Sequence, residues 1–405
     1  MTTWSVLRSG VRRYAFVLAL PAARTLLFGG FIARIEVGGL GLAIILLVHH
    51  STGSIGRGGV AAGAFFLFAA GSQPVQGRLM DRIGRVQTLR VVITAHLCLI
   101  LVFAVLGAHR LTQSLAILLA AGVGATLPAL TSYIRVAWSG VTAGPKLGTV
   151  YALDSVVYEL ALVMGPLLVS LVITVSTAPV ALAVLGSLGF AGGVLVTRVK
   201  TAEESKAVRS AGRSGGVLGA GVAYLVAIQA SVGLGLGAVS VAVPTLAERA
   251  GALNLSGPLL SGFWAASLVG GLWYGAHYWR GPPRRRLIAC LAWSALGLLM
   301  FSVVPSLYGK GIALILAGFA VGPGLTAVLS LVPLVTPNSR LTEAFSWVSF
   351  SEPMGVALGS WASGALLGAV GLGVVLWIPP VGDAIGALLG TLGWSALGVD
   401  VVRRR

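Results

Sequence analysis

The chain has 405 residues, of which 57% are hydrophobic and only 10% are charged. This composition excludes a soluble globular protein, because too few polar residues remain to cover its surface. The net charge of +17 would be compatible with binding to nucleic acid. However, polar loops rich in Lys and Arg alternate along the chain with polar loops that contain few of them, as in membrane proteins. We therefore expect an integral membrane protein with the lipid bilayer, and not nucleic acid, as its partner.

Helices that cross about 30 Å of hydrocarbon need about 20 apolar residues each. We predict an all-α integral membrane fold with twelve transmembrane helices: 24–48, 56–78, 89–108, 111–137, 147–173, 178–197, 216–247, 256–278, 287–306, 309–335, 340–369 and 372–398. If the N-terminus is cytoplasmic, the outer loops hold only four basic residues, namely Arg57, Arg110, Arg249 and Lys310. This positive-inside bias predicts a multi-pass protein of the cell (inner or plasma) membrane with both termini in the cytoplasm.

The hydrophilic stretch from Arg198 to Gly216 separates six segments from six more, and the two halves resemble each other at an offset of about 195 residues. We predict an N-terminal six-helix bundle (1–197), a cytoplasmic linker (198–215) and a C-terminal six-helix bundle (216–405). Pseudo-symmetry between the bundles would place a shared site at their interface, near the membrane midplane.

Residues 77–85 read GRLMDRIGR and lie between the second and third segments. Their glycines permit a tight turn and a close approach of helices. The string resembles the loop 2–3 signature of the major facilitator superfamily, G-x-L-x-D-R-x-G-R-K, at Gly77, Leu79, Asp81, Arg82, Gly84 and Arg85, whereas Val86 replaces a basic residue. The chain looks most like bacterial drug or metabolite efflux members of that family.

A second pair, Gly165-Pro166, is similar to the start of the antiporter signature GPxxGG, with Val169 and Ser170 in place of its last two glycines. The resemblance also implies an inner gate made of Gly77, Asp81, Arg82, Gly84, Arg85, Arg135 and Glu343. Asp81 would face the positive end of the eleventh helix, where Glu343 is a partner for Arg82 or Arg85. Alternatively, the arginines only anchor the loop to lipid headgroups.

Ionisable side chains inside hydrocarbon cost about 2.5–3.5 kcal/mol each, so each needs a function or a partner. The candidates for proton coupling are Arg34, Glu36, Asp154, Glu159 and Glu352. Arg34 and Glu36 point to different faces of one helix. We expect Glu159, Asp154 or Glu36 to pair with Arg34 and to carry the coupled proton. The alternatives are a permanent ion pair and direct contact with substrate, while Asp383 is expected to serve packing.

Aromatic rings that suit an apolar or cationic ligand define the predicted substrate cavity: Phe31, Tyr151, Tyr158, Tyr224, Trp264 and Trp347. The alternative for these rings is helix packing or the interfacial belt. The five histidines are isolated or adjacent to one another and do not have metal-ligand spacing, so we expect no metal site and no cofactor. His96 is among the isolated ones. The sequence contains no catalytic cluster, so an enzyme is not expected.

Taken together, these features predict a monomeric secondary active transporter that exports an amphipathic small molecule by alternating access, coupled to protons. Two alternatives stay open. One is facilitated or proton-linked transport of a metabolite, and the other is a non-transporting sensor or scaffold with the same fold.

Overall fold

The computed structural model describes residues 20–141, 146–199, 219–279, 281–337 and 340–397. Within these residues the regular secondary structure is entirely helical. The helices are α2 (Pro21–Thr52), α3 (Ile55–Ile83), α4 (Arg85–Gly107), α5 (Gln113–Ala125), α6 (Leu130–Val141), α7 (Lys146–Val175), α8 (Ala178–Thr197), α9 (Ala220–Arg249), η1 (Leu253–Leu255), α10 (Ser256–Ala276), α11 (Pro283–Val303), α12 (Leu307–Gly318), α13 (Val321–Val335), α14 (Leu341–Ala369), α15 (Leu372–Val375) and α16 (Ile378–Leu392).

The predicted membrane-spanning helices are confirmed along the described chain. Eleven helical stretches there are long and apolar enough to cross a bilayer. The eleventh predicted segment, 340–369, corresponds to helix α14, which is not among these eleven stretches and is less apolar, because it carries two glutamates and several serines. The predicted segment 216–247 begins outside the described residues, and the segment 372–398 ends outside them. Most of the predicted linker and residues 142–145 also lie outside the described residues.

Two spans are interrupted at matching places in the two halves. The fourth is divided into α5 and α6 around Pro128, and the tenth into α12 and α13 around Phe319 and Ala320. The carboxamide of Gln76, on α3, forms hydrogen bonds with the backbone at the break between α5 and α6. Its Nε2 donates to the carbonyl of Leu127 at 2.8 Å, and its Oε1 accepts from the backbone N–H of Ala129 at 2.9 Å. Buried backbone groups released by the break are thereby paired.

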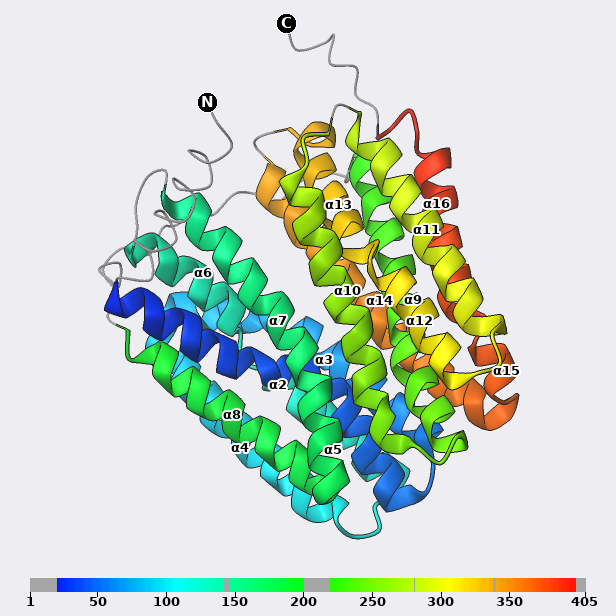
Figure 1. Cartoon of the computed structure of the whole chain (residues 1–405). Helices are drawn as coiled ribbons and strands as arrows, with labels where there is room; N and C mark the ends of the chain where they lie inside the picture. The colour runs from blue at the N-terminus through cyan, green and yellow to red at the C-terminus, as the bar shows by residue number, and fades with distance from the viewer. Residues whose placement is uncertain (1–19, 142–145, 200–218, 280, 338–339, 398–405) are drawn as a thin grey trace, which may run out of the picture.

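The helices form two bundles, with α2–α8 in one and α9–α16 in the other (Figure 1). Helix α3 packs on α14, and α7 packs on α10, across the interface between the bundles. In both contacts the second helix of one half packs on the fifth helix of the other half. A two-fold relation between the halves produces this crossed pairing, because it converts one contact into the other. The exact domain boundaries stay a prediction.

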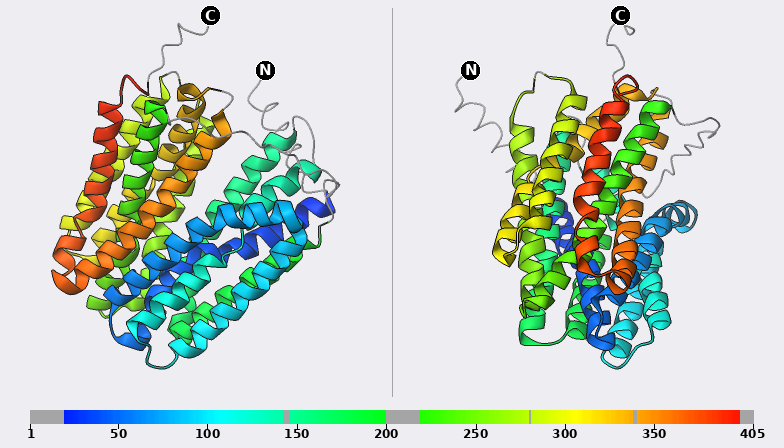
Figure 2. Two further views of the ribbon diagram at one scale, coloured as in Figure 1. Left: turned by 180° about the vertical axis from the view of Figure 1, so that it is seen from behind. Right: turned by 90° about the vertical axis from the view of Figure 1, so that its right-hand side faces the viewer.

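The bundles meet at one end and lie apart at the other (Figure 2). At the closed end, a Cβ on Gly56 would lie 2.7 Å from the carbonyl oxygen of Gly364, so only glycine allows this approach of α3 to α14. The hydroxyl of Ser261 on α10 donates to the carbonyl of Val163 on α7 at 2.7 Å. The bundles diverge toward the splayed end, where α3 ends at Ile83 and α14 begins at Leu341.

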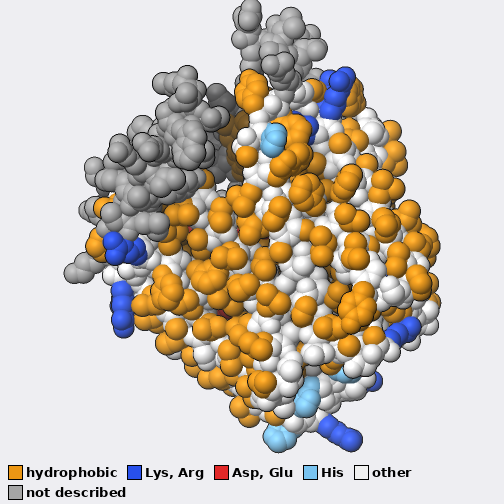
Figure 3. Space-filling view, viewed as in Figure 1, with side chains coloured by type: hydrophobic (Ala, Val, Ile, Leu, Met, Phe, Trp, Pro, Cys, Tyr) orange, Lys and Arg blue, Asp and Glu red, His pale blue; other side chains and the backbone are white. Residues whose placement is uncertain are grey.

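The surface has the distribution expected for contact with lipid. On the face shown in Figure 3, hydrophobic side chains cover the length of the helices, and Lys and Arg side chains lie near the helix ends. Large apolar side chains such as Val175, Leu118 and Leu171 are more than half exposed. Such an apolar surface suits hydrocarbon and not water.

Candidate functional site in the centre of the molecule

A buried ion pair joins α2 to α7 within the N-terminal bundle. Nη1 of Arg34 donates to Oδ1 of Asp154 at 2.7 Å, and Nη2 donates to Oδ2 at 3.1 Å. The Arg34 side chain is 1% exposed and that of Asp154 is 6% exposed. Of the three acids considered from the sequence, Asp154 is therefore the partner of Arg34. The two-bond geometry matches the planar guanidinium to the carboxylate and fixes both groups.

Tyr158 connects this ion pair to three further ionisable groups. It lies one helical turn after Asp154 on α7, and its ring centroid is 5.7 Å from Cζ of Arg34. The Tyr158 hydroxyl is also within electrostatic range of Arg135, Glu159 and Glu352. We call these six residues (Arg34, Arg135, Asp154, Tyr158, Glu159 and Glu352) the central cluster.

The central cluster spans both bundles, because Glu352 belongs to α14 and the other five residues belong to α2, α6 and α7. Glu159 and Glu352 interact electrostatically across the interface. Oε2 of Glu352 accepts a hydrogen bond from Nε2 of Gln229, on α9, at 3.4 Å. Oε2 of Glu159 is buried and has no hydrogen-bond partner among the described residues. The two carboxyl groups therefore belong to opposite bundles, and one oxygen of Glu159 has no partner among the described residues.

Glu36 does not belong to this cluster. It lies on the opposite face of α2, where Oε1 is 3.2 Å from Nε2 of His96 on α4. Our expectation that His96 is an isolated histidine is wrong, and Glu36 is not a partner of Arg34. Asp383 is likewise buried in the other bundle, where it faces Ser294 of α11, and its packing role stays a prediction.

The predicted gate residues lie at the splayed end, where the described residues form a turn without an ion-paired latch. Gly84 ends α3 with φ +110°, a conformation that favours glycine, and α4 begins at the next residue. Gly77 lies inside α3 with open space around it, so the close helix approach expected there is absent in this structure. Among the described residues, the structure shows ion pairs for Arg34, His49 and His96, and none for Asp81, Arg82, Arg85 or Glu343. Arg135 is exposed and belongs with the central cluster.

The predicted cavity aromatics separate into two groups. Tyr151 is 38% exposed and donates from its hydroxyl to the carbonyl of Arg135, and Trp347 is 45% exposed beside Phe350. Phe31, three residues before Arg34 on α2, is half-buried. Together with Tyr158, these three remain candidates for the cavity.

Two of the predicted rings pack between helices instead, which was the alternative expectation. Tyr224 lies against Gly393, where a Cβ would approach its ring to 2.7 Å. Trp264 packs edge-on against Phe263 in the core that α10 shares with its neighbours. Sequence reasoning could not separate the groups, because both lie on apolar helices.

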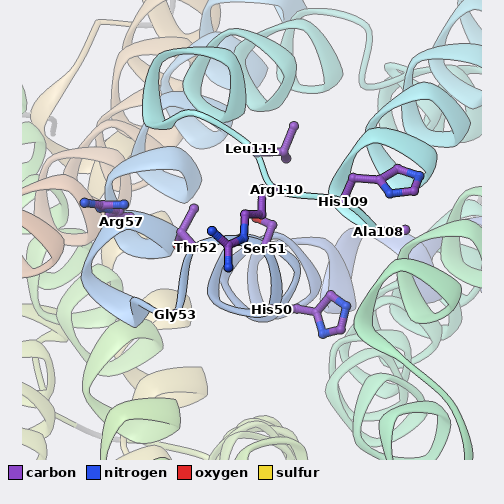
Figure 4. A pocket seen from close by; sticks show the side chains of 9 residues that line it. All are labelled: His50, Ser51, Thr52, Gly53, Arg57, Ala108, His109, Arg110 and Leu111. Carbon is purple, nitrogen blue, oxygen red and sulfur yellow. The ribbon is translucent and has the colours of Figure 1, made fainter.

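A separate cavity of about 790 Å³ lies at the closed end (Figure 4). It is lined by the last turn of α2, the start of α3 and the loop after α4, and its basic side chains are His50, Arg57, His109 and Arg110. The sequence places Arg57 and Arg110 in outer loops. The cavity is far along α2 from Arg34 and does not include the central cluster.

Comparison with known proteins defines the fold and the family. Residues 26–307 match the family model described as Major Facilitator Superfamily. The nucleoside transporter NupG, in a mutant form, has a TM-score of 0.72 at 12% identity, covering 92% of this chain and 100% of that one. A bacterial homologue of the human lysosomal transporter Spinster, in an inward-facing and occupied conformation, has a TM-score of 0.70 at 12% identity, covering 95% and 97%.

The human organic anion transporter MFSD10 has a TM-score of 0.63 at 13% identity, covering 92% of this chain and 100% of that one. No curated protein matches the chain by sequence. At these identities the structural matches define the fold alone.

Proposed function

Because this chain belongs to the major facilitator superfamily, we propose that it is a proton-coupled secondary transporter that exports an amphipathic small molecule by alternating access. The family makes it a membrane transporter and not an enzyme. The observation that supports proton coupling is a pair of acids that belong to opposite bundles: Glu159 on α7, with one buried oxygen that has no hydrogen-bond partner among the described residues, and Glu352 on α14. Rocking of one bundle against the other would change the distance between these acids directly.

A proton bound by either acid removes the repulsion between two carboxylates. The neutral pair lets the bundles close around the site. A proton taken up from outside can then leave when the site opens to the cytoplasm, so that the proton moves inward while the cargo moves outward. Arg34 keeps its charge balanced by Asp154 throughout, so the titrating pair can change its charge without leaving an unpaired arginine.

The positive-inside bias supports an orientation in which the splayed end faces the cytoplasm. In that orientation the structure is inward-facing, and the cargo enters the space between the bundles from inside the cell. Tyr151, Tyr158 and Trp347 offer ring faces for an amphipathic or cationic molecule. One chain supplies both walls of the site, so we propose the monomer, in the plasma membrane, as the working unit.

The test is transport by the full chain in liposomes, with and without an imposed pH gradient. The probes are a lipophilic cation, a nucleoside and an organic anion, each as a radiolabelled compound. We expect the gradient to accelerate movement of at least one probe. E159Q and E352Q should each slow gradient-driven movement by about tenfold or more, equivalent to ~1.4 kcal/mol. Both should still exchange probe for probe.

Glu248→Gln is the matched control, because Glu248 is an acid in a half-exposed pair with His49 at the closed end. It should retain gradient-driven transport. Transport that ignores the gradient would instead identify a facilitated metabolite transporter. Binding of a probe without any flux would identify a sensor or scaffold.

A further inference from the structure

A second polar site lies inside the N-terminal bundle, on the face of α2 that points away from the central cluster. Three helices and a helix end supply it. Glu36 comes from α2, His96 from α4 and Thr126 from the end of α5, and Gly189 of α8 closes the remaining side. Glu36 is 1% exposed and His96 is 2% exposed. A Cβ at Gly189 would overlap with the carboxylate of Glu36, so the site is closely fitted around this acid.

The hydrogen-bond pattern determines how many protons the site holds. The Thr126 hydroxyl lies 2.9 Å from the carbonyl oxygen of Gly122 and 3.2 Å from that of Val123. Its hydrogen is directed to these carbonyls, so its oxygen accepts from the ring nitrogen Nδ1 of His96 at 3.1 Å. His96 therefore carries its proton on Nδ1, which leaves Nε2 facing the Glu36 carboxyl group.

Nε2 and the carboxyl group then need one more proton between them. A neutral imidazole nitrogen and a carboxylate would otherwise present two lone pairs to each other at 3.2 Å. The proton either resides on Nε2, giving an imidazolium–carboxylate pair, or on Glu36, giving a carboxylic acid and a neutral imidazole. The total number of protons is the same in both descriptions.

The residues that the structure describes around Glu36 offer one group, His96, that could compensate a negative charge. His96 is the ionisable group recorded as interacting with Glu36 among the described residues. Helix α8 presents Gly189, and the end of α5 presents Thr126, both uncharged. Arg34 is two residues away on α2 but is bonded to Asp154 on the opposite face. Loss of the proton would require Thr126 to turn its hydrogen to Nδ1 and would leave a net charge in an apolar junction.

We propose that Glu36, His96 and Thr126 form a proton-binding site, distinct from the central cluster, that keeps one proton in the joint between α2, α4 and α8. The proton bonds to Nε2 or to a Glu36 oxygen, and its departure is accompanied by rotation of one hydroxyl hydrogen. The site is closed to solvent, so exchange requires the joint to open. The proton makes the cohesion of this bundle depend on pH independently of transport.

Thermal melting of the full chain in detergent, measured from acidic to alkaline pH, tests this site. The melting temperature of the wild-type chain should fall by several degrees at alkaline pH, where the proton is lost and a carboxylate stays buried. E36Q carries no charge at this position and should not show that fall. Glu248→Gln changes a half-exposed acid–histidine pair and should fall as the wild type does. An equal alkaline fall in E36Q would overturn the proposal.

A second measurement covers the case in which E36Q does not fold. Nitrogen-15 NMR of the histidine rings, with His96→Gln to assign the signal, reports the proton on each ring nitrogen. We expect the His96 ring to carry one proton on Nδ1, toward Thr126, and to share a second one at Nε2 with Glu36. A His96 ring that carries a single proton, on Nε2 and directed to Glu36, would show that the site holds no additional proton.

Discussion

The guanidinium of Arg34 and the carboxylate of Asp154 form two hydrogen bonds, at 2.7 and 3.1 Å, between helices α2 and α7. Both side chains are almost completely buried. Removal of one partner leaves the other charge unpaired in an apolar bundle. We expect Asp154→Asn to destabilise the chain by about 3–5 kcal/mol, the usual cost of breaking such a pair.

The double variant R34Q/D154N should recover most of that loss, because no charge is then left alone. Melting in detergent of the wild type, both single variants and the double variant gives the coupling. Glu248→Gln, which breaks a half-exposed pair, should cost at most about 1 kcal/mol. Losses that simply add in the double variant would mean that the two residues act independently.

The sequence predicts that Arg34 pairs with a buried acid, but it cannot choose among Asp154, Glu159 and Glu36. The choice depends on how α2 and α7 are rotated against each other, and hydropathy does not define that rotation. The two-residue spacing does place Glu36 on a different face from Arg34. Glu36 therefore needs a partner other than Arg34. His96, a histidine inside another apolar segment, was the candidate that the sequence offered.

The membrane spans follow from hydropathy because a helix in lipid must satisfy its own backbone and present apolar side chains. The interruption of the fourth span does not follow in the same way. Pro128 marks a possible break, but its position is stabilised by Gln76 of another helix. The close contact between α3 and α14 at the closed end was also not predicted, because hydropathy does not define which glycines of two apolar helices meet.

The closed end depends on glycines that leave no room for a side chain. A Cβ on Gly364 of α14 would lie 2.5 Å from the carbonyl oxygen of Gly56 and 2.6 Å from the backbone nitrogen of Val60. Gly364→Val should therefore separate α3 from α14 and favour a conformation that is open at this end. Spin labels at the exposed positions Arg57 and Val370 should move apart, as measured by pulsed electron resonance.

Labels at Ile83 and Leu334, which are exposed on opposite bundles toward the splayed end, should approach each other in the same variant. Gly368→Val is the control, because a side chain one turn further along α14 meets no atom within 4 Å. It should keep the wild-type distances. Unchanged distances in Gly364→Val would show that this contact does not hold the closed end.

The gate residues show no ion pair in this conformation among the described part of the chain, and we propose that the latch involving Arg82, Arg85 and Glu343 forms after the splayed end closes. Glu343→Gln should therefore slow transport several-fold without lowering the melting temperature of the present conformation. The two measurements are flux in liposomes and melting in detergent. A lowered melting temperature would indicate that Glu343 already stabilises this conformation, contrary to the latch.

The contact between Gly189 and Glu36 predicts a steric coupling that a double-mutant cycle can isolate. A methyl group at position 189 would displace the Glu36 carboxylate from His96, so Gly189→Ala should destabilise the chain by about 1–3 kcal/mol, as overpacking does. In a Glu36→Ala background the methyl group has space, and the same substitution should cost little. Alanine has a higher helix propensity than glycine, so the substitution by itself should stabilise α8. A measured loss of stability would therefore be due to the steric conflict.

Gly71→Ala on α3 supplies the matched control, because its side chain would enter open space. It should leave the melting temperature unchanged or raise it. Gly189→Ala should also alter the ring-nitrogen signal of His96, since the displaced carboxylate no longer shares its proton, whereas Gly71→Ala should not. If Gly189→Ala costs the same with and without Glu36, the glycine is needed for the packing of α8 on α2 and not for holding the acid in place.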